Sequence, residues 1–312
     1  MDPGDDEGVP VIEVRGLTKR YGPVVAVDDL TFTVPAGRVT ALLGRNGAGK
    51  STTLRMLLGL DRPTAGTARI GGLAAADRAE PLRAVGALLD SSAAHPGRTA
   101  RDHLRWLAAS NRIPARRESE VLDLVDLGAA AGRRVRSFSL GMRQRLGIAA
   151  ALLGDPPVLL LDEPANGLDA EGIRWLRSFL RSLAADGRTV LVSSHLMGEV
   201  ERTADHLLVV HRGQLRADTS VAAFLAGAGA GGRRLRVRTA QPERLRQLLA
   251  AGGAEVREDG DGTLAVSGVG AARVGEVAAR HGVPLLELRT EERSLEDAFL
   301  ALTAGLGPGS AA

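Results

Sequence analysis

The feature that most constrains this chain is a glycine-rich loop that ends in lysine and serine. Residues 44–51 read GRNGAGKS and follow an apolar run, Val39–Leu43. An amphipathic stretch comes next, so the loop lies between a predicted strand and a predicted helix, the context that a phosphate-binding loop requires. Backbone N–H groups of such a loop surround phosphate oxygens, and the helix N-terminus adds partial positive charge. The sequence therefore predicts a nucleoside-triphosphate site.

Two side chains of this loop carry specific chemistry. Lys50 is expected to reach the β- and γ-phosphates, and Ser51 to ligate Mg²⁺ through its hydroxyl. Lys19 and Lys50 are the only lysines in a chain otherwise supplied with arginine, which favours a functional role for Lys50 over a chance match. The residues expected to contact the nucleotide here are Gly44, Arg45, Asn46, Gly47, Ala48, Gly49, Lys50, Ser51 and Thr52.

A second apolar run, Val158–Leu161, ends in two acids, Asp162 and Glu163. A buried strand that delivers a carboxylate to its C-terminal end would place Asp162 beside Mg²⁺. Glu163, one residue on, can polarise an attacking water as general base. The loop and the acids together predict a nucleoside triphosphatase, although small-molecule kinases and GTPases share both features.

The order of predicted elements indicates the fold class. From residue 11 to about 225, short β-branched runs alternate with helical stretches, which predicts an α/β domain with a mostly parallel sheet flanked by helices and an antiparallel part at its N-terminus. Residues 98–154 break this rhythm and predict a helical insertion.

The C-terminal third has a different pattern. Residues 226–232, AGAGAGG, predict a flexible linker. Residues 233–303 follow the order strand, helix, strand, strand, helix, strand, which is typical of a ferredoxin-like α+β unit, with a hairpin turn at 259–262 and a final helix capped at Ser294. The tails 1–10 and 304–312 are expected to be disordered.

Composition excludes several classes of function. Aromatic residues are 3% of the chain and no basic block is interleaved with them, so nucleic acid is not an expected partner. No apolar stretch reaches the ~20 residues of a membrane-spanning helix. The acidic N-terminus does not fit a secretory signal, and the chain contains no cysteine. We therefore expect a cytoplasmic protein.

One motif carries a family resemblance. Residues 137–145, SFSLGMRQR, precede the acidic strand and resemble the LSGGQ signature of the ATP-binding cassette family, with its usual RQR continuation. Ser139 and Gly141 match the signature, and three other positions depart from it. In that family the motif completes the ATP site of the opposite subunit in a head-to-tail dimer, so the resemblance implies that Ser139 and Gly141 bind the nucleotide held by a second copy.

Further landmarks of the family follow in order along residues 11–225. Asn166–Asp169 is similar to the D-loop, which implies that Asp169 contacts the partner's nucleotide site. His195 matches the switch histidine beside the γ-phosphate, and Tyr21, the only tyrosine, matches the aromatic residue that stacks on adenine. Asp90 replaces the glutamine or glutamate that usually assists Mg²⁺; its side chain is shorter, and Ser91 or Ser92 is an alternative donor.

The resemblance implies a function. The chain would be the ATP-binding and ATP-hydrolysing subunit of a transporter, with ATP and Mg²⁺ as ligands, Glu163, His195 and Lys50 as catalytic residues, and a separate membrane permease as partner. It would lie on the inner face of the cell membrane. The sequence FSLGMRQRL and the end of the chain are most similar to those of bacterial drug- and antibiotic-peptide-resistance exporters. The alternative, a soluble cassette ATPase acting on ribosomes or DNA, usually has two cassettes or a coiled coil.

Overall fold

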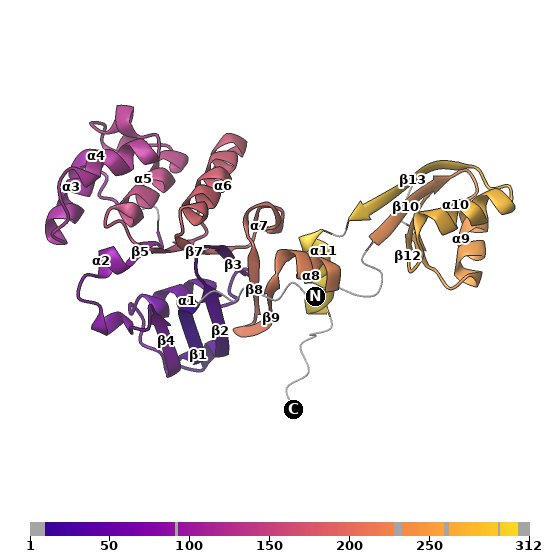
Figure 1. Ribbon diagram of the computed structural model, residues 1–312, viewed down its shortest axis with the longest axis horizontal. Coiled ribbons are helices and arrows are strands. Elements are labelled where there is room, and N and C mark those ends of the chain that lie inside the picture. The colour runs from indigo at the N-terminus through magenta and orange to yellow at the C-terminus, as the bar shows by residue number, and fades with distance from the viewer. Residues whose placement is uncertain (1–9, 91–92, 228–232, 259–261, 293, 305–312) are drawn as a thin grey trace. The chain divides into compact units, whose positions relative to one another are not determined.

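The computed structural model describes residues 10–90, 93–227, 233–258, 262–292 and 294–304 (Figure 1). The chain divides into two compact units, with the division between Ser220 and Val221. The first unit contains two sheets and a group of helices, and the second contains one sheet with its own helices.

A six-stranded sheet forms the centre of the first unit. Its strand order is β5 (Val85–Leu88), β6 (Val158–Asp162), β7 (Thr189–Ser194), β3 (Val39–Leu43), β8 (His206–His211) and β9 (Gln214–Ser220). The first five strands run parallel, and only β9 is antiparallel to its neighbour. Every residue of β3 and β7 is buried, as expected for parallel strands covered on both faces. Parallel strands end at one edge, so this sheet brings the residues after β3, β5, β6 and β7 together.

The predicted antiparallel N-terminal part is a three-stranded sheet. Its order is β2 (Val24–Pro35), β1 (Pro10–Tyr21) and β4 (Ala65–Ile70). Alternate apolar residues of β1 and β2, such as Val14 and Phe32, join helix α1 (Lys50–Leu57) in one core that extends to the central sheet. That core fixes the end of β1, and with it Tyr21, relative to α1.

Helices fill the insertion that the sequence predicts at 98–154. Three α-helices, α3 (Ala100–Ser110), α4 (Arg117–Leu124) and α5 (Leu140–Leu152), contact one another there. The Thr99 hydroxyl caps α3 by accepting a hydrogen bond from the Asp102 N–H. The remaining elements of this unit are η1 (Ala75–Asp77), α2 (Pro81–Ala84), η2 (Gly128–Ala130), η3 (Val135–Ser137), α6 (Ala170–Ala185) and α7 (Met197–Thr203).

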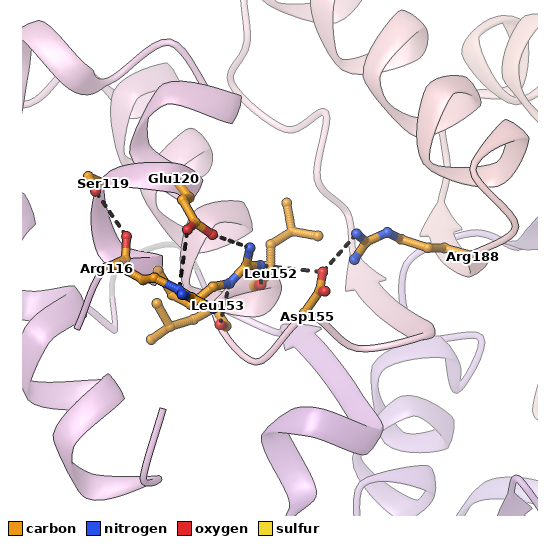
Figure 2. Close-up of polar contacts among 8 residues, drawn as sticks. Arg116, Ser119, Glu120, Leu152, Leu153, Asp155 and Arg188 are labelled. Carbon is orange, nitrogen blue, oxygen red and sulfur yellow. Dashed lines mark hydrogen bonds and ion pairs between the residues drawn. The ribbon is translucent and has the colours of Figure 1, made fainter. Parts of the chain in front are cut away.

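One arginine ties the insertion to the central sheet. Arg117 donates to the carbonyls of Leu152 and Leu153 at the end of α5, at 3.0 and 3.3 Å, where a cation also complements the helix dipole. Figure 2 shows Asp155 just beyond these carbonyls, with Arg188 on its other side. Asp155 accepts from Arg117 at 3.4 Å and from Arg188, which precedes β7, at 2.8 Å. The end of α5 is therefore held against the start of β7.

The second unit has the predicted ferredoxin-like order. Strands β11 (Glu255–Glu258), β12 (Thr263–Ser267), β10 (Arg233–Thr239) and β13 (Leu285–Glu292) form an all-antiparallel sheet in that spatial order. Helices α9 (Pro242–Ala251) and α10 (Ala271–Arg280) share a core with residues such as Val237 and Leu264. The Ser294 hydroxyl caps α11 (Leu295–Ala304) by accepting from the Asp297 N–H at 3.1 Å. The predicted fold class is confirmed.

The structure differs from the expected boundaries at four points. The first compact unit ends at Ser220 and not at about residue 225, because α8 (Val221–Gly227) belongs to the second unit. Pro10 begins β1, so only residues 1–9 of the expected first tail lie outside the described residues. Helix α8 extends over the first two positions of the expected linker. The rest of that linker, most of the expected turn at 259–262 and residues 305–312 lie outside the described residues. Ala304 ends α11. In the part of the chain that the structure describes, no helix has the length and apolar character to cross a membrane.

Candidate nucleotide site

The phosphate-binding loop lies between β3 and α1, as the sequence predicts. Gly49 precedes α1 with φ +100°, and a β-carbon there would lie 2.5 Å from the Ala26 carbonyl oxygen. A β-carbon at Gly44 would lie equally close to the Val210 carbonyl oxygen. Neither position accommodates a larger residue without moving the backbone. The loop is therefore held tightly by β2 and β8, with its N–H groups at the start of a helix.

The loop contains both exposed and buried residues, and arginines lie near it. Arg45 and Asn46 are exposed, whereas Ala48 is buried and its carbonyl accepts from the Gly213 N–H at 3.1 Å. Burial, followed by the charges of Arg212, Arg216 and Arg45, lowers the pKa of His211 at the end of β8. Arg45, Arg212 and Arg216 therefore contribute positive charge near the end of β8.

Lys50, Glu163 and His195 meet at the carboxyl edge of the sheet. The Lys50 ammonium lies 3.1 Å from Glu163 Oε1 and donates to the Gly44 carbonyl at 2.7 Å. Glu163 Oε2 lies 2.8 Å from His195 Nδ1. Lys50 is 5% exposed and the Glu163 side chain 18%. The sheet thus brings the three predicted catalytic residues, from three separate segments, into one chain of contacts.

Ser193 orients both acids and was not singled out by the sequence. It is fully buried in β7, and its hydroxyl donates to Asp162 Oδ1. The same hydroxyl accepts from the Glu163 N–H at 2.9 Å, and the Ser193 carbonyl accepts from that N–H at 3.2 Å. Glu163 has φ +47°, a strained value for a residue other than glycine. Ser193 therefore holds the turn between Asp162 and Glu163 in place.

The predicted metal ligands follow the same edge. Leu88 of β5 pairs with Leu161 of β6, so Asp90, which follows β5, and Asp162, which ends β6, belong to neighbouring parallel strands. Ser51 is exposed in the first turn of α1. Among the described residues, no three His, Cys, Asp or Glu side chains form a metal-binding group. Mg²⁺ is usually bound by one or two carboxylates together with substrate phosphates, and a carboxylate with a hydroxyl beside a phosphate loop fits that donor set. Ser91 and Ser92 lie outside the described residues.

The signature residues lie at the start of α5. Ser139 is the N-cap, and its hydroxyl accepts from the Met142 N–H at 3.2 Å. The nearest atom that a β-carbon at Gly141 would meet is in Leu168, 3.3 Å away. Asp169 caps α6 by accepting from the Gly172 N–H at 2.8 Å. Gly141 therefore lies beside Leu168 of the D-loop segment.

Gln144 links this helix to the acidic turn, a role that the sequence analysis missed. Its side-chain amide is buried and donates to the carbonyls of Glu163 and Asn166 at 3.5 and 3.4 Å. The RQR continuation of the signature could have indicated this role, because a polar side chain on the buried face of a helix needs a hydrogen-bond partner.

Tyr21 ends β1 and is exposed. Its hydroxyl donates to Asp61 Oδ2 at 2.9 Å. The same carboxylate oxygen also accepts from the Nε–H of Arg55, a residue of α1, at 2.8 Å. The predicted adenine-contacting residue is thus joined to the helix that begins with Lys50.

These features define a phosphate-loop ATPase, and comparisons identify its family. Residues 27–166 match the family described as ABC transporter, whereas residues 233–296 match a family described only as a domain of unknown function. The chain belongs to the ATP-binding cassette family of transporter proteins, and its activity is ATP hydrolysis.

Relatives and a solved structure agree with this assignment. The chain is 43% identical over 208 residues to the bacitracin transport ATP-binding protein BcrA of Bacillus licheniformis, covering 66% of this chain and 68% of that protein. It is 36% identical over 205 residues to the lantibiotic transport ATP-binding protein SrtF of Streptococcus pyogenes, covering 66% and 89%. The dimeric structure of MJ0796, a bacterial ABC transporter cassette, superimposes with a TM-score of 0.62 at 25% identity, covering 67% and 98%.

Proposed function

We propose that Lys50, Glu163 and His195 form the catalytic centre for ATP hydrolysis, and that their direct contact is the observation that carries this assignment. Phosphate oxygens replace Glu163 as the partner of Lys50 when ATP binds. The freed Glu163 carboxylate takes a proton from water as the water oxygen bonds to the γ-phosphorus. The bond to the oxygen that bridges the β- and γ-phosphates then breaks, leaving ADP and phosphate. His195 holds the Glu163 carboxylate from its other side.

Ser51 and Asp162 would hold Mg²⁺, with Asp90 assisting from the neighbouring strand. Bound Mg²⁺ supplies charge neutralisation of the β- and γ-phosphate oxygens. The Ser193 hydroxyl, bonded to one oxygen of Asp162, orients the carboxylate so that its other oxygen is available. The remaining loop residues bind phosphates through their N–H groups, and Tyr21 stacks on adenine.

A second copy of the chain would complete the site. The start of α5, with Ser139 as its cap and Gly141 in its first turn, offers N–H groups and a hydroxyl to an anion. Its neighbours within the chain belong to the D-loop segment, so Asp169 would approach the same partner nucleotide. Two ATP molecules would then lie between the two copies, and their binding would favour the closed dimer.

ATP hydrolysis by this chain would drive transport through a separate membrane permease. The relatives named above are transport ATP-binding proteins for bacitracin and a lantibiotic, which supports export of a drug, antibiotic or lipid-like compound. The permease would dock near Asp90 and the helical insertion, placing the chain on the inner face of the cell membrane. The comparisons do not favour the alternative of a soluble ATPase acting on ribosomes or DNA.

The test compares the full chain with its Glu163→Gln variant and with Glu171→Gln as matched control, because Glu171 is exposed on α6. Phosphate release and mass in solution are measured with ATP and Mg²⁺. We expect Glu163→Gln to lose at least about 10²-fold in hydrolysis and to accumulate as an ATP-dependent dimer, whereas the control behaves as wild type. A monomeric Glu163→Gln protein that hydrolyses ATP normally would refute the assignment of the base.

A further inference from the structure

The two lysines of the chain lie in the two parts of the proposed nucleotide site. Lys50 opens α1 at the phosphate loop, and Lys19 lies two residues before Tyr21 on β1. A lysine ammonium is a compact charge on a flexible stem, whereas arginine presents a planar fork. The sequence analysis explained Lys50 alone, which leaves the second lysine to be accounted for.

Lys19 contacts the Tyr21 ring and a distant loop at the same time. Its ammonium lies over the ring, 4.9 Å from the centroid, within the range of a cation–π interaction. The same ammonium donates to the Arg62 carbonyl at 2.7 Å. Arg62 follows α1 in the chain, so Lys19 joins the end of β1 to the segment after that helix.

Asp61 holds the other end of the ring. It accepts the Tyr21 hydroxyl at 2.9 Å and the Arg55 Nε–H at 2.8 Å on the same carboxylate oxygen. Partial desolvation, and then the hydrogen bond to Asp61, raise the pKa of the Tyr21 phenol. The ring is thus fixed at its hydroxyl and contacted over one face, while Tyr21 remains 47% exposed.

We propose that Lys19 is a positioning residue for the purine base. It occupies one face of the Tyr21 ring and so presents the other face to adenine. Its bond to Arg62, together with the Arg55–Asp61 pair, ties that ring to α1. Since α1 begins with Lys50, one helix sets the spacing between the base platform and the phosphate loop. The inference rests on the proposed role of Tyr21 as the adenine platform.

The test compares Lys19→Met with Arg20→Met in the full chain. Methionine keeps an unbranched apolar stem and removes the charge. Arg20 is the next residue, is exposed, and its replacement changes the net charge equally. Calorimetric titration uses two probes with Mg²⁺: ATP, and inorganic tripolyphosphate, which lacks the base. We expect Lys19→Met to weaken ATP binding about five-fold and to leave tripolyphosphate binding unchanged. Arg20→Met should alter neither affinity.

A spectroscopic measurement reports on the ring itself. Tyr21 is the only tyrosine, so the tyrosine part of the near-ultraviolet difference spectrum on adding ATP comes from this side chain. Wild type and Arg20→Met should give the same tyrosine signal at saturating ATP, and Lys19→Met a smaller one. Lys19→Gln retains a donor for the Arg62 carbonyl, and it should show the same selective loss if the methionine variant does not fold.

Three results would overturn the proposal. Wild-type ATP affinity in both Lys19 variants would show that the ammonium does not position the base. Equal weakening of ATP and tripolyphosphate would assign Lys19 to phosphate binding, and an equal loss in Arg20→Met would show an effect of net charge. Failure of the wild-type chain to bind ATP would instead contradict the proposed function, so the two failures are distinguishable.

Discussion

The two units use ion pairs of similar geometry in different surroundings. In the first unit, Lys50 and Glu163 lie 3.1 Å apart with exposed side-chain fractions of 5% and 18%. In the second, Arg246 donates to Glu243 at 2.9 Å on an exposed face of α9. An exposed pair contributes little and is screened by salt, whereas a buried pair costs desolvation that folding alone seldom offsets. The two pairs therefore differ more in burial than in distance.

The central sheet of the first unit and the sheet of the second unit also differ in how their faces are covered. The parallel strands of the first unit are covered on both faces and end at one edge, where the loops after them carry the polar residues. The antiparallel sheet of the second unit has its core on one face, shared with α9 and α10, and exposes residues such as Arg236 and Arg238 on the other. We therefore expect the second unit to be separable from the chemistry, which the following predictions examine.

The largest expected effect is on the stability of the second unit. Leu264 is 1% exposed in its core, so Leu264→Ala should cost that unit about 2–5 kcal/mol of unfolding free energy. Calorimetry should show one transition moving to lower temperature and another remaining. Phosphate release at a temperature below both transitions should stay within about two-fold of wild type. A loss of hydrolysis in Leu264→Ala would contradict this separation, because it would show that the two units are coupled.

A smaller change in the first unit should affect hydrolysis directly. Ser193→Ala removes the hydroxyl that bonds to both Asp162 and Glu163, and we expect hydrolysis to fall about ten-fold through misplaced acids. Ser194→Ala is the matched control, because the Ser194 hydroxyl accepts from the Leu196 N–H at 3.0 Å. The half-saturating Mg²⁺ concentration should rise in Ser193→Ala alone. Equal rates in the two variants would remove Ser193 from the site.

The smallest expected effect concerns pH. Burial, followed by the charge of Arg98, lowers the pKa of His103 in α3. The folded state therefore keeps this imidazole neutral while the unfolded chain takes up a proton below its ordinary pKa of about 6.5. Its contribution is fully present above that pH and is lost as pH falls toward the lower folded value.

Unfolding by urea at about pH 7.5 and about pH 5.5 measures this contribution. His103→Leu should show less loss of unfolding free energy on acidification than wild type, by about 1 kcal/mol or less. An unchanged difference between the two pH values would show that His103 does not titrate with folding.

The sequence predicted the elements better than their arrangement. The phosphate loop, the acidic strand end and His195 each follow an apolar run, and the structure places all three at one sheet edge. The position of β3 between β7 and β8 depends on crossover connections that no local pattern encodes. The order of elements sufficed for the ferredoxin-like unit, because hairpins and helices constrain its connections.

The sequence analysis missed residues whose role is to hold another functional residue in place. Ser193 lies in an apolar run, where a lone serine has no spacing that marks it as functional. The roles of Gln144 and Lys19 likewise depend on hydrogen bonds to carbonyls that are distant in the sequence. The composition of residues 226–232 predicted a flexible linker, whereas the helix that begins at Val221 continues over the first two of these positions.

The contact between Lys50 and Glu163 also bears on nucleotide affinity. Without nucleotide, the Glu163 carboxylate is a resident counter-anion for the phosphate-loop lysine, and an incoming triphosphate must displace it. Glu163→Gln removes this competitor as well as the base. That variant should therefore bind ATP more tightly as a single chain, before any second copy is present. Its trapped dimer would then have two sources of stability, one within each chain and one between them.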